Sequence, residues 1–160
     1  MLYLALKVLH ILAVILFLGN IITGLFWKAH ADRSRNPEVI AHTLEGIIRS
    51  DRLITIPSVI AIGVAGIIAA IVGKLPILGT GWIFWSTVLF ALSGLAFSLR
   101  VAPLQVRLAE VARAGGTKGK FDWKRYHALS REWELWGLFA ILTPLAAVVL
   151  MVFKPAIPGL

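Results

Sequence analysis

The chain of 160 residues contains no cysteine. Without a thiol it cannot form disulfides, thiolate zinc sites or iron–sulfur clusters, and it cannot attach a c-type haem covalently. Acidic residues are scarce as well, with 8 Asp and Glu against 16 Lys and Arg. The sequence also has no phosphate-binding glycine loop, no zinc-protease motif and no nucleophile–base arrangement. Its motifs therefore indicate none of the familiar soluble enzyme classes.

Apolar residues are abundant and make up 59% of the chain, whereas charged residues make up 15%. Four apolar stretches each have about the 20 residues that a hydrocarbon core of about 30 Å requires. We expect spans at about 3–27, 53–73, 82–102 and 135–153. The first stretch lacks a signal-peptide cleavage pattern, so we expect it to be retained. The predicted fold is all-α: a single transmembrane domain, residues 1–160, folded as a polytopic four-helix bundle.

Basic residues are distributed unevenly between the connections. The first and third connections carry most of the Lys and Arg, whereas Lys7, Lys74 and Lys154 lie near the opposite ends of the spans. The positive-inside rule therefore places these two connections in the cytoplasm and both termini outside a bacterial inner membrane. This asymmetry accounts for the net charge of +8 without nucleic acid as a partner. The expected partner of the surface is the lipid bilayer.

The two cytoplasmic connections have helical patterns of their own. Asn36-Pro37-Glu38 reads as a helix start: a side-chain cap, proline at the first position and an acid at the positive end. Apolar residues then recur at helical spacing, which predicts an amphipathic helix over Pro37–Ser50 lying along the membrane interface. In the third connection, a helical extension past Pro103 is predicted to end in a glycine-rich turn at 114–120. Asp122 is predicted to cap the next helix.

Of the four histidines in the sequence, His10 is the one that is predicted at membrane depth. A bare imidazole nitrogen in hydrocarbon costs several kcal/mol, so His10 must have a partner or be a ligand. It shares a helix face with Asn20 and Gly24 at steps of three and four, which turns this face toward the bundle. Met151 is predicted at similar depth on the fourth span, and a His/Met pair is a known axial arrangement for haem iron.

Three lysines near the outer ends would then be available to pair with haem propionates: Lys7, Lys74 and Lys154. Each of these candidates also has a structural interpretation. His10 could donate a hydrogen bond to a neighbouring helix, Met151 could pack in the bundle, and the lysines could anchor the helix ends at the interface.

Other polar residues are given structural roles. Asn20 is expected to join two helices by a hydrogen bond. Asp51 and Arg52, just before the second span, are expected to form an interfacial charge pair. The remaining histidines are expected to be solvated in the cytoplasmic segments: His30, His42 and His127.

Five segments carry a resemblance to a known family: residues 6–13, 51–53, 76–79, 103–105 and 151–155. Together they resemble an uncharacterised family of bacterial four-helix membrane proteins, a domain of unknown function (DUF2269). This resemblance implies a topology but no activity. The Lys7-x-x-His10-Ile11 segment is also similar to the start of HemJ-type protoporphyrinogen oxidases and of copper-resistance D-like membrane proteins. The former resemblance implies that His10 holds haem b, although the later-helix lysine of those oxidases has no clear match here.

These observations give two main hypotheses. In the first, the chain is a haem-b-binding redox or electron-transfer protein of the membrane, with His10 on the haem iron and a quinol, a porphyrin or a redox protein as partner. In the alternative, it is a non-enzymatic accessory subunit of a larger membrane complex, or a homo-oligomer, and His10 makes an interhelical hydrogen bond. Transport of copper or a small solute ranks last, because a single intramembrane histidine makes a poor pathway.

Overall fold

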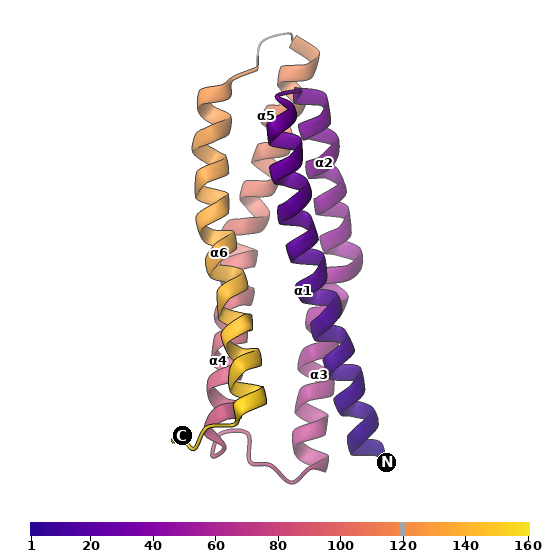
Figure 1. Cartoon of the computed structure of the whole chain (residues 1–160), viewed down its shortest axis with the longest axis vertical. Coiled ribbons are helices and arrows are strands. Elements are labelled where there is room, and N and C mark those ends of the chain that lie inside the picture. Colours follow the sequence, from indigo (N-terminus) through magenta and orange to yellow (C-terminus); the bar gives the residue numbers. More distant parts are fainter. Residues whose placement is uncertain (119–120) are drawn as a thin grey trace.

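The computed structural model describes residues 1–118 and 121–160, which form a bundle in which successive long helices run antiparallel (Figure 1). The first helix is α1 (Leu2–Ser34) and the last is α6 (Trp123–Phe153). The second is continuous through α2 (Pro37–Ser50), a π-helical segment η1 (Asp51–Thr55) and α3 (Ile56–Val72). The third is continuous through α4 (Gly81–Ala96), a second π-helical segment η2 (Phe97–Val101) and α5 (Ala102–Lys118).

The predicted all-α fold is confirmed, and within the described residues 4 helices are long and apolar enough to cross a membrane. Each helix is nevertheless longer than the span predicted within it. The 36 residues of Pro37–Val72 extend over about 54 Å at 1.5 Å per residue, whereas the hydrocarbon core is about 30 Å thick. The excess lies at the end of the bundle where α2, α5 and the adjoining parts of α1 and α6 run together (Figure 1). The helices at this end of the bundle therefore extend further than is needed to cross the hydrocarbon core.

The helix predicted at 37–50 is present with those bounds. Its cap is also as predicted, because the side chain of Asn36 accepts a hydrogen bond from the backbone N–H of Glu38 at 2.9 Å. It does not, however, form a separate element lying along a membrane interface. It continues through η1 into α3 and packs against α1 and α5. Its apolar face is thus buried by neighbouring helices of the bundle.

The end of α5 differs from the predicted turn at 114–120. The helix continues to Lys118, and residues 119 and 120 lie outside the described part of the chain. Gly115 is needed there for packing, because a Cβ at this position would overlap the ring of Phe121. The cap of the next helix is as predicted: the side chain of Asp122 accepts from the N–H of Arg125 at 2.9 Å, and α6 begins at Trp123.

A proline follows each π-helical segment at the same distance. Pro57 and Pro103 both lie two residues after the segment ends. Proline has no N–H, and its ring clashes with the carbonyl four residues earlier, so an ordinary α-turn is strained at this point. In both segments the next residue instead donates its N–H to the carbonyl five residues earlier: Ile56 to Asp51, and Ala102 to Phe97. The wide turns accommodate the prolines without ending the helices.

Pro144 is accommodated differently, by a neighbouring helix. It lies inside α6 and cannot donate to the carbonyl of Ala140. The hydroxyl of Ser93 on α4 donates to that carbonyl at 2.6 Å instead. This replacement bond is the type that allows proline within membrane helices.

Two hydrophobic clusters stabilise different levels of the bundle. We call residues 25–50 and 102–136 the charged half, and residues 2–19, 56–96 and 137–160 the apolar half. The charged half holds the larger cluster, with Ile40, Leu44 and Leu108 almost fully buried. The smaller cluster consists of Ala13, Phe17 and Ile62. In the apolar half α1 pairs with α3 and α4 pairs with α6, so this end consists of two helix pairs (Figure 1).

Candidate functional site

His10 on α1 contacts the facing helix α3. Its Nδ1 lies 2.9 Å from the carbonyl oxygen of Ile62. A carbonyl oxygen can only accept, so Nδ1 is the donor in this hydrogen bond. The ring also packs on Gly66, where a Cβ would lie 3.0 Å from both Cε1 and Nδ1 of His10. The glycine therefore lets α3 approach the imidazole closely.

The other predicted ligand, Met151, belongs to the second helix pair. It lies near the end of α6 and is half-buried, and α6 packs mainly against α4 while α1 packs mainly against α3. The structure thus places the two predicted axial ligands on different helix pairs, and their pairing on one haem iron stays a prediction. The described side chains include no group of three or more His, Asp or Glu placed to hold a metal ion.

The three lysines lie at helix ends in the apolar half. The ammonium of Lys7 lies 5.6 Å from the ring centre of Tyr3, and that of Lys154 lies 5.4 Å from the ring centre of Trp82. Lys74 has a positive φ of 54° in the turn after α3. Cation–π contacts of this kind hold an ammonium beside an aromatic ring, which fits the interpretation of Lys7 and Lys154 as interfacial anchors.

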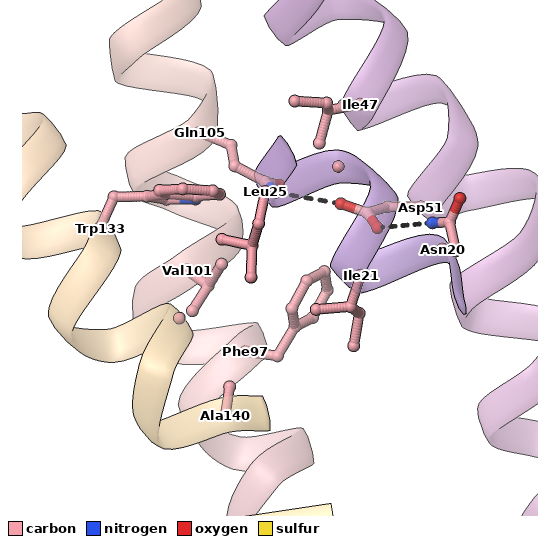
Figure 2. A pocket seen from close by; sticks show the side chains of 12 residues that line it. Asn20, Ile21, Leu25, Ile47, Asp51, Phe97, Val101, Gln105, Trp133 and Ala140 are labelled. Carbon is pink, nitrogen blue, oxygen red and sulfur yellow. Dashed lines mark hydrogen bonds between the residues drawn. The ribbon is translucent and has the colours of Figure 1, made fainter. Parts of the chain in front are cut away.

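A second group of polar side chains lies deeper, where the two halves meet (Figure 2). We call Asn20, Asp51, Thr55 and Gln105 the polar centre. Asp51 accepts from the hydroxyl of Thr55 at 2.8 Å and from the amide of Gln105 at 3.0 Å. The amide of Asn20 donates to Thr55 at 2.9 Å and to Asp51 at 3.3 Å. The polar centre thus joins α1, η1 and α5, and the predicted role of Asn20 between helices is confirmed.

The position of Asp51 corrects the predicted charge pair. Its side chain is buried at 7% exposure, whereas Arg52 is exposed. Its described hydrogen-bond partners are the neutral side chains of Asn20, Thr55 and Gln105. The signal in the sequence is the spacing of Asp51 and Thr55, which are four residues apart and share a helix face.

A cavity of about 30 Å³ adjoins the polar centre. Asn20, Asp51 and Gln105 line it together with apolar residues of α1, η2 and α6. The indole of Trp133 also lines it and, in Figure 2, reaches from α6 toward Gln105. Trp133 is 4% exposed, and its Nε1 has no hydrogen-bond partner among residues 1–118 and 121–160. An indole N–H donor is thus buried beside a carboxylate-containing cluster.

The sequence pattern places Lys28 in a charged connection and therefore does not predict that it is buried. Lys28 is 2% exposed and donates to Asp32 at 2.7 Å, Ser130 at 2.6 Å and Glu134 at 3.2 Å. Its ammonium also lies 5.2 Å from the ring centre of Trp133. The predicted exposure of the remaining histidines is confirmed for His30, His42 and His127, although all three lie within helices.

Comparison with known proteins identifies a family but no characterised relative. A family model described as "Predicted integral membrane protein (DUF2269)" matches residues 4–155. No curated protein and no solved structure matches the chain. The membrane location indicated by the four apolar helices agrees with the description of the family.

Proposed function

We propose that this chain, which belongs to the family of predicted integral membrane proteins (DUF2269), is a non-enzymatic subunit of a membrane complex. The observation that carries the proposal is the hydrogen bond from His10 Nδ1 to the carbonyl of Ile62. This bond uses Nδ1 of the imidazole to join α1 to α3. A second copy of the chain or another membrane protein would be the partner.

The other polar side chains of the apolar half support the same role. Ser86 donates to the carbonyl of Ala147 at 3.2 Å, and Ser93 donates to that of Ala140 at 2.6 Å. Both bonds join α4 to α6. Small polar residues used in this way hold membrane helices together, because apolar contacts give no hydrophobic driving force in lipid. These two hydrogen bonds of the apolar half thus serve helix association.

The charge distribution supports an orientation for this subunit. In the proposal the charged half lies on the cytoplasmic side of a bacterial inner membrane, and both termini lie outside. Arg and Lys concentrate in the charged half, as the positive-inside rule requires of a cytoplasmic side. Cysteines introduced at Leu160 and at His42, both exposed, would be labelled from opposite sides by a membrane-impermeant maleimide.

The role of His10 is tested by a double-mutant cycle with Gly66. Gly66→Ala places a Cβ 3.0 Å from the imidazole, and overpacking of this type costs about 1–3 kcal/mol. In a His10→Ala background the ring is gone, so the cost of Gly66→Ala should disappear. Gly63→Ala is the matched control, because a Cβ there meets nothing within 4 Å. Equal effects of Gly66→Ala in both backgrounds would contradict the packing role.

The subunit role is tested by cross-linking in intact membranes, before detergent is added. The expected product is a discrete species larger than the 17.5 kDa chain, with the same partner in replicate preparations. A chain that stays monomeric in membranes and in mild detergent would overturn the assignment as a subunit.

Haem b is the second candidate, and one observation favours it. Nε2 of His10 has no hydrogen-bond partner among the described residues, while Nδ1 donates to a carbonyl. This is the outer-shell arrangement common to metal-binding histidines. The arrangement supplies one axial ligand for haem iron, His10, since Met151 lies on the other helix pair. Bound haem b would supply one-electron redox chemistry, and His10 would hold it.

The absorption spectrum of the purified protein separates the two candidates. The subunit proposal expects a colourless preparation from haem-replete cells. A Soret band in the wild type that is lost in His10→Ala, with helical content unchanged by circular dichroism, would replace the subunit proposal with haem binding. A band that persists in His10→Ala would contradict His10 as the ligand.

A further inference from the structure

The cavity beside the polar centre is lined by a residue with a buried donor and by a residue with buried acceptor oxygens. Trp133 Nε1 is a donor without a described partner, and it belongs to a residue that is 96% buried, since 4% of it is exposed. An indole N–H can only donate. The carboxyl group of Asp51, which lines the same cavity, can accept a further hydrogen bond. A molecule that both accepts and donates would satisfy the two groups together.

The size of the cavity limits which molecule can bridge the two groups. Its volume is about 30 Å³, and one water molecule requires roughly 10–15 Å³ measured with a water-sized probe. The space therefore suits one or two molecules of this size. The lining also argues against a metal cation, because the amides of Asn20 and Gln105 direct N–H groups at Asp51. Hard cations require oxygen ligands.

We propose that this cavity is an internal water-binding site, in which one or two waters accept from Trp133 Nε1 and donate into the polar centre. Such a site meets the usual condition for buried water, which is a polar space with two or more hydrogen-bonding partners. The water connects α6 to the α1–η1–α5 cluster. With it, all the long helices of the described chain would share one hydrogen-bonded network at the level of the polar centre. This inference is independent of the proposed subunit role.

The direct test is water contact at the indole proton. With 15N-labelled tryptophan, Trp133→Phe assigns the Trp133 indole signal, and a rotating-frame Overhauser experiment on the wild type separates bound water from proton exchange. The expected result is a direct water cross-peak at Trp133, where bulk solvent does not reach. Trp85 provides the internal comparison, because its Nε1 donates to the carbonyl of Pro158 at an exposed position. Absence of a water cross-peak at Trp133 in the folded wild type would overturn the proposal.

A change in cavity size gives a second, independent readout. Gly137 lines the cavity, and a Cβ there meets nothing within 4 Å, so Gly137→Ala fills space without a clash. The water cross-peak at Trp133 is expected to fall at least twofold. Gly63→Ala, with the same open surroundings on α3, should leave it unchanged. An equal cross-peak in both variants would show that the observed water lies outside this cavity, which contradicts the site.

Discussion

The two halves of the bundle are stabilised in different ways. In the charged half, apolar side chains converge on a contiguous core in which Leu108 is 0% exposed. In the apolar half, the helix surfaces are hydrophobic but mostly unburied, and in α1 only 11% of the most apolar window is buried inside the chain. The charged half is therefore built like a soluble helical bundle. The apolar half leaves most of its hydrophobic surface for lipid or for other protein.

Different forces hold the helices together at each level. In water, burying apolar area drives helices together, so large side chains fill the core. In lipid that driving force is absent, and close packing of small residues with interhelical hydrogen bonds takes its place. The close packing of Gly66 against His10 and the hydrogen bond from Ser93 to Ala140 are examples of the forces that act in lipid. Matched substitutions in the two halves should therefore have unequal effects.

The largest difference is expected for leucine truncation. Leu108→Ala in the charged half should cost about 2–5 kcal/mol, because it removes a fully buried side chain and leaves a cavity. Leu12→Ala on α1 should have a much smaller effect, because Leu12 is 52% exposed in the apolar half. Thermal unfolding in detergent, followed by circular dichroism, measures both. Equal costs would show that Leu12 is covered by a tight protein interface, and the contrast between the halves would fail.

The next largest effect is expected at the buried ammonium of the charged half. Lys28→Met keeps the length of the side chain but leaves Asp32 and Glu134 without their cation. Breaking a buried pair by removing one partner costs about 3 kcal/mol at the low end of the usual range. The low end applies because the side chains of Asp32 and Glu134 are 26% and 57% exposed.

Neutralising Asp32 and Glu134 tests whether unpaired carboxylates cause the loss of stability in Lys28→Met. Asp32→Asn combined with Glu134→Gln in the Lys28→Met background should restore part of the lost stability, because the unpaired carboxylates are removed. Glu132→Ala serves as the control, since the pair between Glu132 and Arg100 is exposed and 3.9 Å long, and its loss should be too small to resolve. No recovery in the triple variant would mean that Lys28 contributes through packing alone.

The parts of this structure that were predictable from sequence are the local ones. Asn36 and Asp122 were identified as helix caps because a cap depends on a few neighbouring residues. The four apolar helices follow from length and composition. Lys28 was misplaced because α1 continues to Ser34, beyond the apolar span. How far a helix extends into water depends on partners that lie far away in the sequence.

The polar centre was missed for a geometric reason. A π-helical turn contains more residues than an α-turn, so it rotates the faces of the residues that follow relative to an ideal helix. Asp51 follows Ile47 by four residues and continues the buried face of α2 into such a segment, so the helical pattern indicates its burial but not the positions of the residues after it. Gln105 lies 54 residues away, and the partner of a buried carboxylate at this separation is set by helix pairing.

The smallest effect is expected at the carbonyl that Pro144 leaves unpaired in the apolar half. Ser93→Ala removes the hydroxyl that donates to Ala140, and hydrogen bonds between membrane helices contribute about 0.6 kcal/mol on average. Thr87→Ala is the control within α4, because Thr87 donates to Ile83 of its own helix. Pro144→Ala restores a backbone N–H to the same carbonyl, so Ser93→Ala should then cost less. If the cost of Ser93→Ala were the same with and without Pro144, the serine would contribute by packing, and the apolar half would depend less on replacement hydrogen bonds than its geometry indicates.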